Sequence, residues 1–144
     1  MSQPAAATVR RSVGCWLVAV AARVVETAIR ASTEPDYDIA VQLPIRAAIY
    51  LAVIAVIAQL RHGRRWARIV LTIVLGGLGL LSLLIEPVTW WAAGHTSGDF
   101  FAAADAPTLT VAVVRIVHIG AVLAALWFMY TPEANAYFRR AQEE

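Results

Sequence analysis

The chain has 144 residues, of which 60% are hydrophobic and only 15% are charged, and its mean hydropathy is +0.65. Soluble domains average roughly a quarter charged residues, so this composition argues against a soluble domain and favours a membrane protein. The formal net charge is +2, and most of the arginines flank apolar stretches, as membrane topology alone requires. We therefore expect no nucleic-acid partner.

Four apolar stretches come near the length of roughly 20 residues that crosses the hydrocarbon core of a bilayer. Most of them are apolar on all sides, and a chain of this length cannot bury four such helices in a core of its own. The sequence therefore predicts an all-α fold. We expect a single integral membrane domain over residues 1–144, built as a four-transmembrane-helix bundle in the lipid bilayer.

The first predicted span, about residues 13–31, is the least apolar of the four. It contains Arg23, Glu26 and Arg30, and spacings of three and four residues bring these side chains to one face of a helix. Ionisable residues inside a span cost about 2.5–3.5 kcal/mol each at the bilayer centre on insertion scales. These three residues are therefore candidates for a functional or structural role.

The second predicted span, about residues 43–60, has one charged residue, Arg46. Tyr50 follows four residues later and lies on the same helix face. Because the chain crosses back in this span, Arg46 is expected near the same membrane surface as Arg30.

The third predicted span, about residues 66–85, contains Gly76, Gly77 and Gly79 and is followed directly by Glu86. Small residues let membrane helices approach one another closely. We interpret the glycines as packing positions inside the bundle, with a dimer face as the alternative.

The fourth predicted span, about residues 109–130, places Arg115 and His118 on one helix face. The segment after it, Thr131-Pro132-Glu133, combines a capping residue, a proline at the first turn and an acidic residue. This combination is typical of a helix start. It predicts a short amphipathic helix in the C-terminal tail.

The charges of the connections predict how the spans are oriented, because Lys and Arg gather on the cytoplasmic side. The N-terminal tail, the second connection and the C-terminal tail are basic. The first connection (residues 32–42) and the third (about residues 92–108) contain acidic residues and neither Lys nor Arg. This alternation predicts a multi-pass protein of a bacterial cytoplasmic (inner) membrane with both termini in the cytoplasm.

Two stretches resemble segments of known proteins. One is Gly63-Arg64-Arg65-Trp66-Ala67-Arg68 at the entry to the third span, and the other is the run 131–139 after the fourth span. Both are similar to a group of small, uncharacterised actinobacterial four-span integral membrane proteins. The resemblance implies a four-span membrane protein and brings no activity or site residue with it.

In this orientation all four spans place polar residues in the outer half of the membrane. Such side chains should face inward and pair, because lipid offers them no partner. The structural interpretation is that Glu26 and Glu86 pair with Arg23, Arg46 or Arg115 and tie the helices together. A second interpretation is a polar cavity open to the outer face, where the excess of Arg over Glu binds a lipid phosphate or a carboxylate. Docking of a partner through these charges is a third.

The function that we favour is non-enzymatic: an accessory or scaffolding component that packs against a larger membrane complex or forms a homo-oligomer. The alternative is a binding or transport unit for an anionic lipid or small anion. No hydrolase triad, phosphate-binding loop or metal-ligand spacing occurs, and one intramembrane histidine is a poor haem site, so we expect no enzyme, metal or cofactor. The candidate polar residues are Arg23, Glu26, Arg30, Arg46, Glu86, Arg115 and His118.

Overall fold

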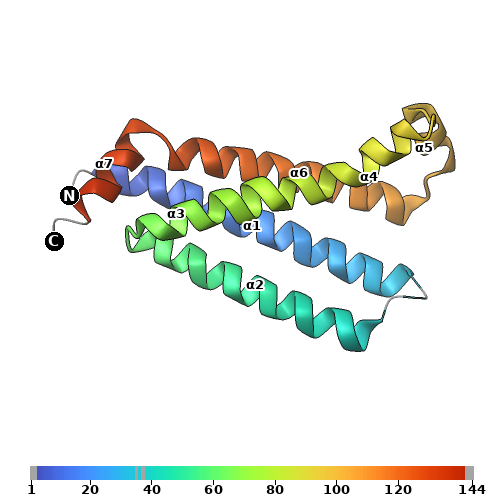
Figure 1. Ribbon diagram of the computed structural model, residues 1–144, viewed down its shortest axis with the longest axis horizontal. Helices are drawn as coiled ribbons and strands as arrows, with labels where there is room; N and C mark the ends of the chain where they lie inside the picture. Colours follow the sequence, from blue (N-terminus) through green and yellow to red (C-terminus); the bar gives the residue numbers. More distant parts are fainter. Residues whose placement is uncertain (1–2, 35, 37, 142–144) are drawn as a thin grey trace.

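The computed structural model describes residues 3–34, 36 and 38–141, and this part of the chain is helical, without a strand (Figure 1). The all-α prediction is confirmed. The elements are α1 (Gln3–Thr33), α2 (Ile39–Arg61), α3 (Arg65–Leu71), η1 (Thr72–Gly79), α4 (Leu80–Ala92), α5 (Ser97–Ala103), α6 (Ala106–Met129) and α7 (Pro132–Arg140).

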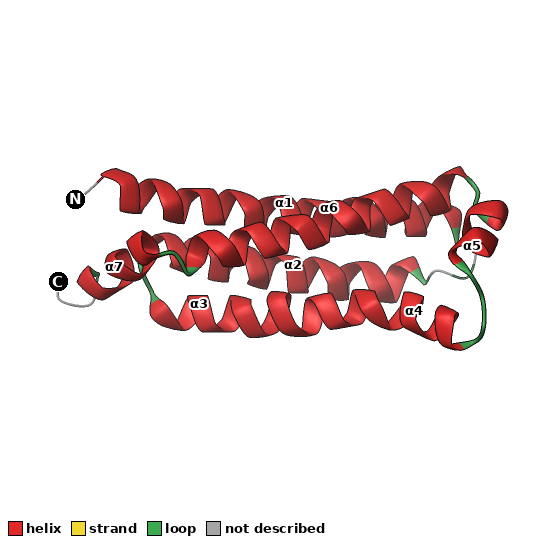
Figure 2. Cartoon of the chain, turned by 90° about the horizontal axis from the view of Figure 1, so that it is seen from above, coloured by secondary structure: helices red, strands yellow, loops and turns green. Residues whose placement is uncertain are grey.

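Four helical segments are long and apolar enough to cross a membrane: α1, α2, residues 65–92 and α6. The segment 65–92 is one continuous helix in which α3 and α4 flank the π-helical η1. The four segments lie alongside one another in both views (Figure 2). One end of the molecule holds both termini and the turn at residues 62–64, and we call it the terminal end. The opposite end, with the connections 34–38 and 93–105, is the distal end.

The helices extend past the predicted spans, and the third predicted connection contains a helix of its own. α5 forms there because Thr96 and Asp99 make a reciprocal capping box, with the Thr96 amide donating to Asp99 at 2.7 Å and the Asp99 amide donating to Thr96 Oγ1 at 3.3 Å. These donors, the Thr96 backbone amide first, hold the pKa of Asp99 below its ordinary value. Hydropathy alone could not have located α5, because a capping box acts locally.

The most extensive contact between described helices joins α1 to α6. Ala19 and Ala125 are fully buried, which lets the two helices approach closely. Ser12 Oγ donates to the Ala125 carbonyl at 2.9 Å, so a polar side chain is satisfied inside this contact. Trp16 is also fully buried here. The first predicted span, although the least apolar, is therefore the one that the rest of the chain covers most.

The glycines of the third span divide into two groups. A Cβ on Gly76 would lie 3.2 Å from Leu126 of α6, so this glycine packs between helices as predicted. The nearest atoms to a Cβ on Gly77 or Gly79 belong to the helix's own backbone, five residues earlier in the chain. These two positions lie in the wider π-helical turns of η1, where they make no interhelical contact of this kind.

At the terminal end, α7 folds back against the long helices. Thr131 caps it by accepting from the Ala134 amide at 3.4 Å, as the sequence predicts. Phe138 is 1% exposed, and the Tyr137 hydroxyl donates to the Arg61 carbonyl at 2.8 Å. Gly63 permits this docking: its φ is +72°, and a Cβ there would lie 2.5 Å from the Cβ of Ala141. The apolar face of α7 is therefore covered by the protein.

α2 is the least covered of the long helices. Its two buried residues, Ile57 and Leu60, lie near the terminal end. Its most hydropathic 18-residue window contains no buried residue, whereas 44% of the corresponding window in α1 is buried. α2 packs on α1 and α3, and it lacks a comparable contact with η1 or α4 among the described residues.

Candidate functional site

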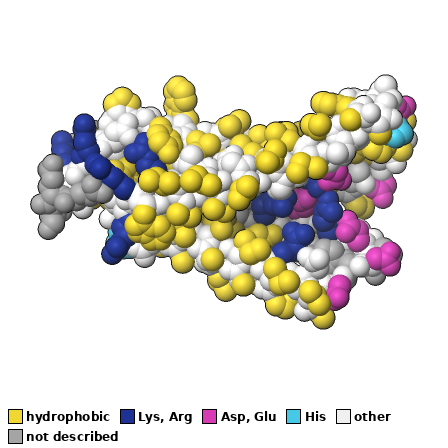
Figure 3. All heavy atoms as spheres, in the orientation of Figure 1, with side chains coloured by type: hydrophobic (Ala, Val, Ile, Leu, Met, Phe, Trp, Pro, Cys, Tyr) yellow, Lys and Arg dark blue, Asp and Glu magenta, His cyan; other side chains and the backbone are white. Residues whose placement is uncertain are grey.

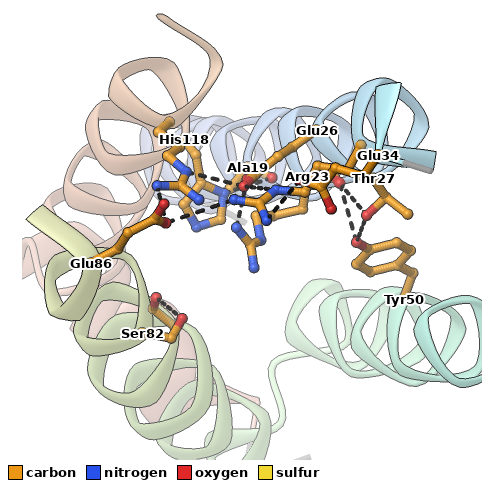
Figure 4. Close-up of polar contacts among 12 residues, drawn as sticks. Ala19, Arg23, Glu26, Thr27, Glu34, Tyr50, Ser82, Glu86 and His118 are labelled. Carbon is orange, nitrogen blue, oxygen red and sulfur yellow. Dashed lines mark hydrogen bonds and ion pairs between the residues drawn. The ribbon is translucent and has the colours of Figure 1, made fainter. Parts of the chain in front are cut away.

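A buried carboxylate lies at the centre of the polar residues near the distal end. Glu26 is 4% exposed, and three arginines surround it. Arg23 donates to Oε2 at 2.6 Å, Arg115 Nε donates to Oε1 at 3.0 Å, and Arg30 Nε lies 3.4 Å from Oε1. Figure 4 shows Arg23 and Glu26 of α1 in the space between the helices, with Glu86 pointing toward them from α4. Two of the arginines come from α1 itself, at the predicted spacings, and the third comes from α6.

Glu86 extends this arrangement to α4. Its carboxylate lies 2.7 Å from Arg115 Nη1 and 3.7 Å from Arg30 Nη2. Arg115 therefore bridges a buried and an exposed glutamate, since the side chain of Glu26 is 6% exposed and that of Glu86 is 65% exposed. We call Arg23, Glu26, Arg30, Glu86 and Arg115 the distal cluster. It links α1, α4 and α6 through charge-assisted bonds, which are about twice as strong as neutral hydrogen bonds.

α2 reaches the same region through a tyrosine. The Tyr50 hydroxyl lies 2.7 Å from Thr27 Oγ1 and donates to the Arg23 carbonyl at 3.1 Å. Thr27 is 4% exposed. Tyr50 lies on the predicted polar face of α2, whereas Thr27 was not among the predicted polar residues. A threonine next to Glu26 inside an apolar helix was the available signal.

His118 lies one turn from Arg115 along α6 and faces α1. It is 4% exposed, and its Nδ1 lies 2.8 Å from the Ala19 carbonyl. This contact accounts for the histidine as a hydrogen-bonded packing residue between α1 and α6.

Arg46 is the exception among the predicted residues. Its expected pairing with Glu26 or Glu86 is not observed, and it makes no hydrogen bond or ion pair with any described residue. The reason is that arginines of α1 and α6 already occupy both carboxylates. The Nε of Arg46 is nevertheless buried without a partner.

Glu34 lies in the first predicted connection, where its side chain is 49% exposed, and it also pairs with Arg30 at 3.4 Å. The pairing follows from the length of α1, which continues to Thr33 and so brings residue 34 within one turn of Arg30. Arg30 thus lies near three carboxylates and holds none of them closer than 3.4 Å.

The distal cluster is suited to holding helices together and to presenting guanidinium donors. Within the described ranges, no group of three or more His, Cys, Asp or Glu side chains is placed to hold a metal ion. The scan against protein-family models gave no match, and the searches of curated proteins and of solved structures found no similar chain.

Removing the charge of Glu26 should destabilise the protein strongly, because it leaves the Arg23 guanidinium without its paired carboxylate and Arg115 with Glu86 alone. We expect Glu26→Gln to lower the free energy of unfolding by about 3 kcal/mol, the scale for breaking a buried ion pair. Glu133→Gln on the exposed surface of α7 is the matched control and should change it by less than about 0.5 kcal/mol. Steric trapping in bicelles measures both values. Small and equal changes would show that Glu26 needs no partner.

Proposed function

We propose that the four apolar segments form a membrane-spanning four-helix bundle in a bacterial cytoplasmic membrane, with both termini in the cytoplasm. The distribution of charge supports this orientation, since basic residues gather at the cytoplasmic ends of spans. In Figure 3 arginines lie at the terminal end and acidic side chains at the tip of the distal end. The terminal end holds Arg10, Arg11, Arg61, Arg64, Arg65, Arg68, Arg139 and Arg140, and the distal connections hold Glu34, Asp36, Asp38, Asp99 and Asp105.

Cysteine labelling in intact cells tests this orientation. Cys15 is the single cysteine, so a Cys15→Ser background can carry one new cysteine at a time. Gly98→Cys, in the exposed α5, should react with a membrane-impermeant maleimide in intact cells. Arg139→Cys, in α7, should react only after the cells are permeabilised. Labelling of both positions in intact cells would overturn the four-span orientation.

Within this bundle, the chain acts as a non-enzymatic accessory or scaffolding component of a membrane assembly. The supporting observation is the uncovered surface of α2, whose apolar window contains no buried residue. Helices associate in membranes through close van der Waals packing, and this face offers a length of apolar surface that no other helix of the chain covers. The partner is an apolar transmembrane helix of a larger complex or of a second copy of this chain.

The charged residues of the spans fit this role. Glu26 and Glu86 are engaged by arginines, and His118 is bonded to a backbone carbonyl. None of these groups is therefore an unengaged acid or base. The distal cluster stabilises the arrangement of α1, α4 and α6, and α2 remains the helix that is free to pack elsewhere.

Site-specific photocrosslinking tests the role of α2. Leu51 on α2 and Ile116 on α6 are matched positions, because they are 68% and 69% exposed and both lie well inside their apolar segments. A photoreactive residue at Leu51 should yield an adduct with a protein chain, whereas the same residue at Ile116 should yield lipid adducts only. The mass of the protein adduct separates a second copy from a different protein. Lipid adducts alone at both positions would refute the accessory role.

A further inference from the structure

Of the predicted polar set, Arg46 alone has no hydrogen-bond or ion-pair partner among the residues that the structure describes. It shares a helix face with Tyr50, and the contacts of Tyr50 with Thr27 and Arg23 show that this face is turned toward α1. Burial of the Arg46 Nε without an acceptor is costly, because a guanidinium cannot lose its proton. An unsatisfied group of this kind calls for a partner that the described residues do not supply.

The helix geometry places Arg30 at the same level of the bundle as Arg46. α1 and α2 run in opposite directions (Figure 1), and Thr27 lies level with Tyr50. One turn toward the distal end reaches Arg46 on α2 and the neighbourhood of Arg30 on α1. Arg30 donates no hydrogen bond to a described residue, and its ion-pair distances are 3.4, 3.4 and 3.7 Å. Two weakly engaged guanidinium groups therefore lie at one level of the molecule.

Charge balance at this level favours an anion. The ion pairs here join three arginines (Arg23, Arg30 and Arg115) to three carboxylates (Glu26, Glu34 and Glu86), and Arg46 adds one positive charge that none of these carboxylates pairs with. Each guanidinium has five donors, and most of them make no hydrogen bond within the cluster. A phosphodiester has one negative charge and several acceptor oxygens, and guanidinium groups bind such oxygens in a bidentate manner.

The site is open on the side between α2 and α4. These two helices do not pack along one another. In Figure 3 the charged side chains of this region are visible at the surface, between two apolar surfaces. Arg23 and Arg30 are 27% and 29% exposed, so the opening reaches the guanidinium groups.

We propose that Arg46 and Arg30 bind a phosphate group that enters between α2 and α4 at the distal end, carried by an anionic lipid. Arg46 lies seven residues, or about 10 Å, from the start of α2. A long arginine side chain covers part of that distance by reaching toward the headgroup layer, and the lipid phosphate enters between the helices to meet it. The proposal rests on the membrane-spanning orientation proposed above but not on the accessory role.

Native mass spectrometry of protein released from nanodiscs tests the site, with phosphatidylglycerol as the anionic probe and phosphatidylcholine as the zwitterionic one. The wild-type chain should retain phosphatidylglycerol in preference. Arg46→Gln should lower that retention about tenfold or more, the scale for losing hydrogen bonds to a charged group. Arg46→Lys should keep part of it, and Arg64→Gln at the terminal end should keep all of it. Equal retention in Arg46→Gln and Arg64→Gln would overturn the proposal.

Two further readouts keep the result decisive. Millimolar inorganic phosphate should leave the retained lipid in place. Displacement of the lipid by phosphate would show that the same donors take the free anion.

If Arg46→Gln does not fold, photoactivatable phosphatidylglycerol can be crosslinked to the wild-type chain. An adduct within residues 39–50 supports the site, and adducts elsewhere alone overturn it. The maleimide labelling above tests the orientation separately, so failure of the lipid site and failure of the topology give different results.

Discussion

A carboxylate buried among apolar helices is stable only where cations pair with it. The helices of this fold must therefore bring arginines to Glu26. Its two oxygens bring Arg23 to 2.6 Å and Arg115 to 3.0 Å. Arg115 can reach it only if α6 lies along α1 in the observed register, and the second contact of Arg115, with Glu86, fixes α4 at the same level. The hydrogen bonds of Ser12 and His118 across the same helix pair follow from that register.

Much of this arrangement could be predicted from the sequence, because its cause is local. Hydropathy located four long apolar helices, and spacings of three and four residues placed Arg23, Glu26 and Arg30 on one face. The sequence did not predict which side chains pair between helices. That pairing depends on the register of the helices and on which arginines compete successfully for the two glutamates. Arg46 looked equivalent to Arg115 in the sequence, but the glutamates accept only the arginines that α1 and α6 bring to them.

Other features arise from capping and from backbone geometry, which hydropathy does not report. α5 exists because of a capping box between Thr96 and Asp99, and Glu34 joins Arg30 because α1 runs to Thr33. The π-helical turns of η1 involve Gly77 and Gly79, which had been assigned only a packing role. In each case, the structure differs from the sequence-based prediction at a helix end or in a glycine-containing segment. The conformation there is set by the local backbone.

Because the arginines of α1 and α6 take both glutamates, two described features of α2 remain free to bind something outside the chain. α2 is held mainly near the terminal end, so its apolar surface is open to another helix. Arg46 has no carboxylate, so its donors are open to an anion from outside the chain. Both proposals therefore follow from one asymmetry. The charges tie α1, α4 and α6 together, whereas among the described residues α2 is joined to them through Tyr50 and apolar contacts alone.

A double-mutant cycle between Glu26 and Arg115, measured in a lipid bilayer, tests most directly whether this ion pair holds the helices together. The free energies of unfolding of the wild type, Glu26→Gln, Arg115→Gln and the double variant give the coupling of the two side chains. Our account predicts a double variant that is less destabilised than the sum of the single variants by about 1 kcal/mol or more. Additive losses, within about 0.5 kcal/mol, would contradict it, because the two residues would then stabilise the protein independently.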